Sequence, residues 1–134
     1  MAFDWVWRDK IRKTVILDSS AILMFFEFSV DWEKELDSLL GGYHIVIPTA
    51  VIQELKVLAE NQKGQKKTAA ALKLIKKYET IDEESRYADD ALLKIAEKTK
   101  GIVVTNDTVL RQRLKKQGNS VIFLRGKKKL FLDE

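Results

Sequence analysis

The sequence contains no cysteine and only one histidine, His44. Without cysteine the chain has no disulfides, iron–sulfur clusters, thiol nucleophiles or cysteine-ligated zinc, and one histidine excludes a site built from several imidazoles. Proline occurs once and glycine six times, and no Pro/Gly-rich linker interrupts the 134 residues. Any metal site must therefore use carboxylate, hydroxyl or amide oxygens.

Long hydrophobic segments are also missing. The longest apolar run, 21–26, is far shorter than the roughly 20 residues that cross a membrane. The N-terminus, MAFDWVWRDK, has acidic residues where a secretory signal needs an apolar core. We therefore expect a cytoplasmic protein without membrane association. At this length we also expect one domain over 1–134, large enough to bury a core.

Charge is plentiful and slightly positive. The 24 Lys and Arg residues against 20 Asp and Glu residues give a net charge of +4, which favours a polyanionic partner such as nucleic acid. Cations gather in an aromatic and basic N-terminal arm, 1–13, and in a basic C-terminal tail, 125–134. We expect the arm to pack on the domain edge, with base stacking on RNA as the alternative.

The stretch 14–23, TVILDSSAIL, organises the chain. Its first four residues are a continuous apolar run, typical of a strand buried on both faces. The run stops at Asp18, and Ser19 and Ser20 are candidate N-caps for a helix that continues to Phe28. Asp18 thus lies where a strand passes into a helix. That position suits a helix cap, or a ligand site at the edge of an open α/β sheet.

Strands and helices are predicted to alternate along the whole chain. Apolar runs bounded by turn residues predict strands, and helical spacing of apolar residues predicts helices. Further strands are expected at 44–47, 79–82, 102–104 and 121–124, and further helices at 31–40, 49–59, 68–78, 87–99 and 108–117. This alternation predicts an α/β fold with a Rossmann-like parallel sheet sandwiched between helices.

Further acidic residues occupy positions like that of Asp18. Glu54 flanks an apolar helix stripe, Asp89 and Asp90 lie in the first turn of a helix, and Asp107 follows an apolar strand. Each alone could be a solvated or dipole-stabilising acid. Gathered at one sheet edge, they would repel unless protons or a cation neutralised them. Oxygen ligands fit Mg²⁺ or Mn²⁺, and such sites activate water for phosphodiester hydrolysis of the two-metal type.

Four motifs in this order resemble the PIN-domain nucleases: ILDSSAIL at 16–23, PTAVIQEL at 48–55, YADDALLKIA at 87–96 and VVTNDTVLRQRL at 103–114. The resemblance covers nearly the whole chain. It is strongest to the archaeal single-domain forms, which are similar to VapC toxins and to eukaryotic ribosomal RNA processing endonucleases. It implies a PIN-like fold and an endoribonuclease that uses Mg²⁺ or Mn²⁺ to cut single-stranded RNA.

The resemblance also implies roles for individual residues. It assigns the catalytic, metal-binding acids to Asp18, Glu54, Asp90 and Asp107, and an Ala-Leu pair after the third acid selects Asp90 over Asp89. This register stays open, because the two acids are adjacent. The supporting polar residues are Ser19, Ser20, Asp89, Thr105 and Asn106. The cations expected to hold the RNA backbone are Arg111, Arg113, Lys115, Lys116, Lys127, Lys128 and Lys129.

The partners implied are RNA together with either an antitoxin or ribosome-assembly proteins. The basic tail favours RNA processing over a toxin role. The aromatic residues of 25–32 would suit a homodimer interface if they were exposed, but we expect most of them to face the core.

Three other interpretations compete with a nuclease. The chain could be a non-catalytic RNA- or protein-binding module on a nuclease fold. A receiver-like signalling domain would need a second acid beside the first strand, where Asp18 is instead followed by two serines. His44 as a general base has no Ser or Cys motif to serve.

Overall fold

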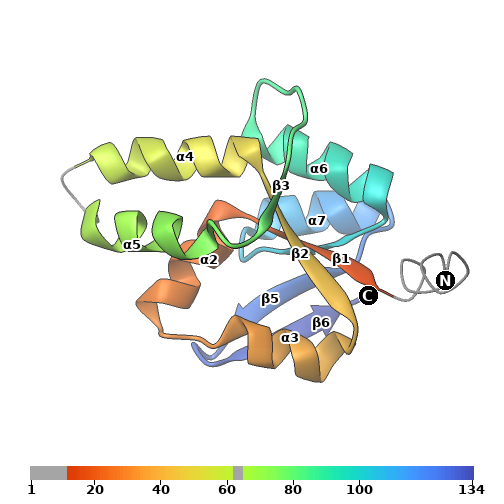
Figure 1. Ribbon diagram of the computed structural model, residues 1–134. Coiled ribbons are helices and arrows are strands. Elements are labelled where there is room, and N and C mark those ends of the chain that lie inside the picture. The colour runs from red at the N-terminus through yellow and green to blue at the C-terminus, as the bar shows by residue number, and fades with distance from the viewer. Residues whose placement is uncertain (1–11, 62–64) are drawn as a thin grey trace, which may run out of the picture.

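The apolar run before Asp18 forms β1 (Lys13–Leu17), a central strand of a six-stranded sheet (Figure 1). The computed structural model describes residues 12–61 and 65–134. Val15, Ile16 and Leu17 are fully buried, as a strand covered on both faces requires. The other strands are β2 (Tyr43–Pro48), β3 (Glu79–Ile81), β4 (Ile102–Val104), β5 (Val121–Arg125) and β6 (Lys129–Asp133). Their order is β3-β2-β1-β4-β5-β6.

Helices connect the parallel strands, which confirms the predicted α/β class. They are α2 (Ser19–Glu27), α3 (Trp32–Leu40), α4 (Thr49–Glu60), α5 (Gln65–Ile75), α6 (Ala88–Thr99) and α7 (Thr108–Lys116). The pair α4 and α5 lies side by side, and α6 packs against β1, β2 and β4 (Figure 1). None of the helices in the described part of the chain is long and apolar enough to cross a membrane.

The strand order reverses between β1 and β4. From β1 the chain moves outward to β2 and β3, and from β4 it moves to the other side through β5. The backbone N–H of Asp18 donates to the carbonyl of Val104 over 3.3 Å, so the ends of β1 and β4 lie side by side. In open α/β sheets, this reversal opens a crevice beyond the carboxyl ends of the strands. The fold therefore places Asp18 and the 105–107 loop at the position where such sheets bind ligands.

The predicted basic tail is wrong, because most of residues 125–134 belong to the sheet. Strand β6 pairs antiparallel with β5, with Arg125 opposite Lys129. The turn between them uses Gly126 and Lys127, both at positive φ (66° and 68°). The run of basic residues concealed this strand, whose buried side chain Leu130 lies between the exposed Lys129 and Phe131. Residues 1–11 of the predicted N-terminal arm lie outside the described residues.

The aromatic residues of the early helices face the core, as predicted. Phe25 and Trp32 are buried and stack with ring centroids 5.1 Å apart. Phe26 and Phe28 are partly buried against the same core. The indole N–H of Trp32 donates to the Tyr78 hydroxyl over 2.9 Å, which satisfies the polar atom of this side chain.

A tight junction joins α6 to β4, and it predicts opposite effects for two neighbouring substitutions. A Cβ on Gly101 would lie 2.9 Å from the carbonyl oxygen of Thr14 in β1, a backbone atom that cannot move freely. We expect Gly101→Ala to lower the free energy of unfolding by about 1–3 kcal/mol and the melting temperature by about 5–10 °C. Lys100, at φ 52°, occupies the left-handed position that favours glycine. Lys100→Gly should therefore stabilise the protein by about 0.5–1 kcal/mol.

Thermal unfolding of the two variants beside the native chain measures both effects. Equal melting temperatures for Gly101→Ala and the native protein would show that the backbone of β1 shifts at little energetic cost to accommodate the added methyl group.

Candidate active site

Asp18 is a buried carboxylate at the end of β1. Only 4% of the residue is exposed, and its Oδ1 accepts a hydrogen bond from the Ala21 N–H over 2.8 Å. Asp18 is therefore the N-cap of α2, and the prediction that Ser19 or Ser20 caps this helix is wrong. Ser20 instead donates its hydroxyl to the Asp18 carboxylate over 2.9 Å. This network fixes the orientation of the carboxylate.

Burial raises the pKa of Asp18 to about 6. Hydrogen bonds from Thr105, Ala21 and Ser20 lower it partly, and the negative charge of Asp89 raises it further. A buried carboxylate held by neutral donors carries a charge that a bound cation would stabilise. The chemistry of this position therefore fits a hard metal ion.

Glu54 reaches the same region from α4. The Ser19 hydroxyl donates a hydrogen bond to the Glu54 carboxylate, which connects the start of α2 to the first half of α4. Glu54 is otherwise exposed. The carboxylate is therefore accessible to solvent and to a ligand while it is held close to the residue that follows Asp18.

Asp89 is influenced by the charges of the other acids, whereas Asp90 is paired with Arg113. Partial burial raises the pKa of Asp89, followed by the negative charges of Asp107 and Glu54. Asp90 instead accepts a hydrogen bond from Arg113 over 3.1 Å. Consecutive helix residues point about 100° apart, so Asp89 and Asp90 face different surroundings. The side-chain environments thus favour Asp89 as the acid of the site, although the resemblance to PIN-domain nucleases selects Asp90.

The loop after β4 holds Asp107 through local and long-range hydrogen bonds. Asp107 caps α7 by accepting from the Leu110 N–H over 3.1 Å, and its own N–H donates to the Thr105 hydroxyl over 3.1 Å. Asn106 uses both amide atoms on the Leu124 backbone, at 2.8 and 2.9 Å. Asn106 therefore anchors the loop to β5, and this fixes the position of Asp107.

Asp18, Glu54, Asp89 and Asp107 form what we call the acidic cluster. Asp18 follows β1, Glu54 lies in α4, Asp89 lies in α6 and Asp107 is the N-cap of α7. All four donor groups are carboxylates, the ligands that Mg²⁺ and Mn²⁺ prefer. Within residues 12–61 and 65–134, no three acidic or histidine side chains have converged to form a metal site. The cluster thus has the right donors and electrostatics for a metal ion without a preassembled coordination shell.

His44 lies away from this cluster. Its ring is 3.1 Å from the Thr14 hydroxyl, and these residues are paired near the amino ends of β2 and β1. The acidic cluster lies at the carboxyl ends of the strands. His44 therefore cannot act as a general base for chemistry at the acidic cluster.

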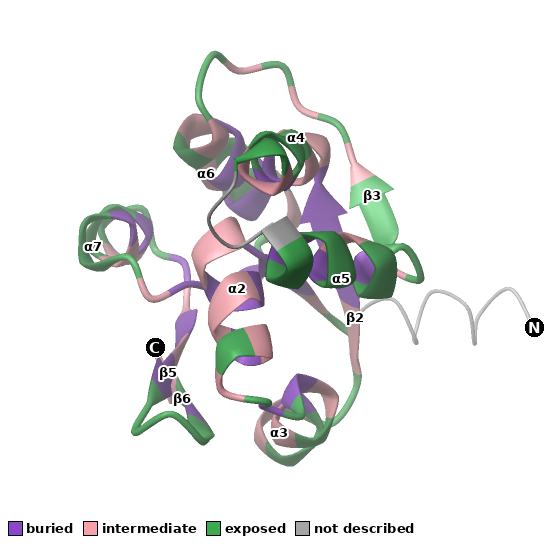
Figure 2. Ribbon diagram, turned by 90° about the vertical axis from the view of Figure 1, so that its left-hand side faces the viewer, coloured by how far each residue is buried: buried purple, intermediate pink, exposed green. Residues whose placement is uncertain are grey.

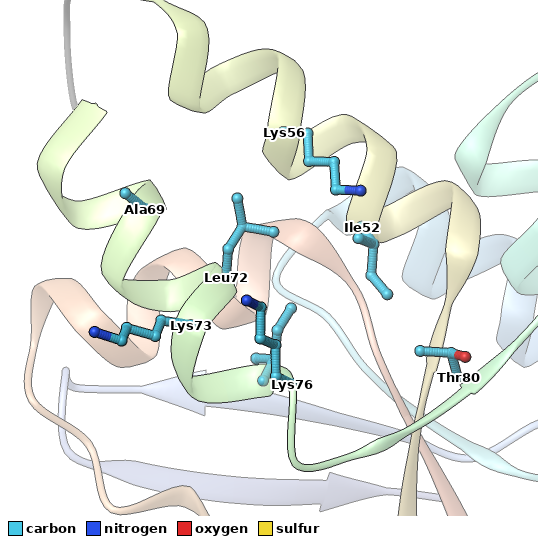
Figure 3. A pocket seen from close by; sticks show the side chains of 8 residues that line it. Ile52, Lys56, Ala69, Leu72, Lys73, Lys76 and Thr80 are labelled. Carbon is cyan, nitrogen blue, oxygen red and sulfur yellow. The ribbon is translucent and has the colours of Figure 1, made fainter.

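An apolar hollow of about 610 Å³ lies between α4 and α5 (Figure 3). Ile52 and Leu72 form part of its wall, and Lys56, Lys73 and Lys76 surround it. Its lining residues include none of the acidic cluster. This hollow therefore contributes nothing to the chemistry of the carboxylates.

Several of the predicted RNA-binding cations are engaged within the protein. Arg111 and Lys115 both contact Asp133 in β6, over 3.0 and 2.6 Å, and these bonds lower the pKa of Asp133. The sequence does not reveal the role of Asp133, because its partners Lys115 and Arg111 lie 18 and 22 positions earlier in the chain. Lys127, Lys128 and Lys129 are exposed around the turn of the hairpin.

Comparison with known proteins identifies relatives of this chain. The "PIN like domain" family model matches residues 15–127. Ribonuclease VapC4 of Methanocaldococcus jannaschii is 30% identical over 120 residues, covering 85% of this chain and 92% of the relative. Ribonuclease VapC9 of Archaeoglobus fulgidus is 31% identical over 127 residues, covering 93% and 92%.

Solved structures show the same fold. The PIN domain endonuclease Utp24 superposes with a TM-score of 0.76 at 24% identity, covering 90% of each chain. VapBC2 of Rickettsia felis, solved bound to a promoter DNA fragment, superposes with a TM-score of 0.61 at 16% identity, covering 84% of this chain and 98% of that one. The family match over most of the chain, together with the two relatives of similar length, shows that this chain belongs to the PIN-domain family.

Proposed function

We propose that this chain is an endoribonuclease that hydrolyses phosphodiester bonds of single-stranded RNA with Mg²⁺ or Mn²⁺. The observation that carries the proposal is the acidic cluster, in which Asp18 is buried beside the end of β4 and the Ser19 hydroxyl holds the Glu54 carboxylate close to it. The negative charges of Asp107 and Glu54 also act on Asp89. The names of the two relatives, both ribonucleases, support RNA as the substrate.

Each member of the acidic cluster has a distinct role in this proposal. Asp18 would bind the metal from the buried side, held in place by Ala21 and Ser20. Glu54, Asp89 and Asp107 would complete the ligand set, which is large enough for the predicted two-metal type of site. The bound metal would supply activated water and stabilise charge on the phosphate. Asp90 would hold Arg113 beside the cluster.

The partner that we propose is an antitoxin. The sequence favours ribosomal RNA processing only through its basic C-terminal segment, and that segment is part of the β5–β6 hairpin. The relatives are named VapC, and one structural neighbour is the VapBC2 complex, so a toxin with a protein antitoxin is the better-supported role. The homodimer stays a prediction, which the mass measured by light scattering would test.

Cleavage of a labelled single-stranded RNA by the purified protein tests the proposal. We expect cleavage in Mg²⁺ or Mn²⁺, none in EDTA, and recovery when Mn²⁺ is restored. Titration calorimetry should detect Mn²⁺ binding in the absence of RNA. A double-stranded RNA of the same sequence is the substrate control. Metal and RNA binding without cleavage would favour the non-catalytic binding module instead.

A further inference from the structure

Cations and aromatic rings follow one another on one face of the β5–β6 hairpin. The Arg111 guanidinium lies 4.0 Å from the Phe123 ring centroid, and the rings of Phe123 and Phe131 stack at 6.0 Å. The Arg125 guanidinium lies 5.5 Å from the Phe131 centroid. We call Arg111, Phe123, Phe131 and Arg125 the aromatic–cation ladder. The two phenylalanines are directly paired across the strands, so their side chains share one face.

The ladder leads to the edge of the sheet that carries the acidic cluster. Strand β5 runs parallel to β4, so the carboxyl end of β5 at Arg125 lies at the same edge as Asp107. The bonds between Asn106 and Leu124 connect the two strand ends directly. Figure 2 shows the hairpin beside α7, with its turn coloured as exposed. A strand of RNA could therefore pass from the hairpin to the carboxylates without crossing the core.

The outer part of the ladder is accessible and positively charged. Phe131 is 39% exposed, and Arg125 and the three lysines at 127–129 are also exposed. The other face of the hairpin is closed, because Leu124 and Leu130 are buried in the core. Asp133, the acid on the ladder face, is already bonded to Arg111 and Lys115. The outer part of the ladder therefore combines a partly exposed ring with an excess of positive charge.

We propose that the aromatic–cation ladder is a docking platform for single-stranded RNA, which directs the strand toward the acidic cluster. Bases would stack against Phe131, and Arg125 with the lysines at 127–129 would contact the phosphates. The bases of a duplex are already stacked and paired, so the platform selects single strands. That the bound RNA leads to the acidic cluster rests on the proposed nuclease function. Binding of RNA to the ladder does not depend on cleavage.

RNA binding measured in EDTA tests the platform without cleavage. We expect Phe131→Ala to raise the dissociation constant for a fluorescent single-stranded RNA about five- to tenfold, because base–aromatic stacking is lost. Leu74→Ala, an exposed residue on α5 with 41% exposure, is the matched control and should bind like the native protein. Arg125→Gln should lower the slope of log affinity against log salt by about one, whereas Lys73→Gln on α5 should not.

Two further measurements guard against a folding defect. Phe131→Leu keeps an apolar side chain at this position and should also weaken binding, because it lacks a flat ring. RNA carrying 5-iodouridine should crosslink to Phe131 in the native protein. Native-like RNA binding by both Phe131 variants, or preference of the native protein for an acidic peptide over single-stranded RNA, would overturn the platform. If Phe131→Ala weakens binding but the native protein cleaves no RNA with Mn²⁺, the platform stands and the nuclease proposal fails.

Discussion

Asp18→Asn will lower the rate of RNA cleavage about a thousandfold, equivalent to roughly 4 kcal/mol of transition-state stabilisation. The amide keeps the size of the carboxylate, and its oxygen can still accept the Ala21 N–H, so α2 remains capped. The lost property is the negative charge in a buried position, which we propose binds the metal. Cleavage rates and Mn²⁺ affinity measured side by side should both fall.

The same substitution should stabilise the metal-free protein at neutral pH. The pKa of Asp18 rises from 3.8 to about 6 on folding, so the folded state disfavours the ionised form. Stability therefore falls as pH rises from about 4 to 6 and stays lower above this range. Each unit of pKa shift corresponds to about 1.4 kcal/mol. Because the Ser20 hydroxyl bonds less strongly to an amide, we expect a net gain of about 1–2 kcal/mol for Asp18→Asn at pH 7.5.

Urea unfolding in EDTA at pH 4 and pH 7.5 measures this effect. The gain should be present at pH 7.5 and nearly absent at pH 4, where the native carboxyl group is protonated. Glu97→Gln, an exposed residue on α6, removes one negative charge and should change neither cleavage nor stability appreciably. If Asp18→Asn were less stable than the native protein at pH 7.5, ionisation of Asp18 would not destabilise the folded state.

Asp89→Asn and Asp90→Asn should differ greatly in activity. We expect Asp89→Asn to lower the cleavage rate about a hundredfold, because Asp89 is coupled to Asp107 and Glu54 and would bind the metal. Asp90→Asn removes a half-exposed ion pair with Arg113, and such pairs contribute about 0–1 kcal/mol. Its rate should therefore stay within about threefold of the native rate.

The two variants are ideal controls for each other, because they make the same chemical change one residue apart in one helix turn. Rate constants at saturating RNA and Mn²⁺ dissociation constants should both be determined. A larger loss for Asp90→Asn would show that the Ala-Leu spacing identifies the functional acid and that the metal-bound side chains reorient. Equal losses would assign both carboxylates to the site.

The sequence alone determined the features that depend on neighbouring residues. The apolar run before Asp18 predicted a buried strand, and Asp107 was predicted between a strand and a helix, because burial and helix capping follow local patterns. The alternation of strands and helices then predicted the sheet class and the edge at which these acids gather.

Tertiary structure decided what depends on distant contacts and on rotation about a helix axis. Spacing leaves the choice between adjacent acids open, and only the packing of α6 brings Asp90 to Arg113 and Asp89 under the influence of Asp107 and Glu54. The C-terminal basic run became β6 because it pairs with β5, and Glu35, 95 positions away, accepts the backbone N–H of Leu130. Charge patterns carry no information about such pairing, because a strand is stabilised mainly by its contacts with the neighbouring strand.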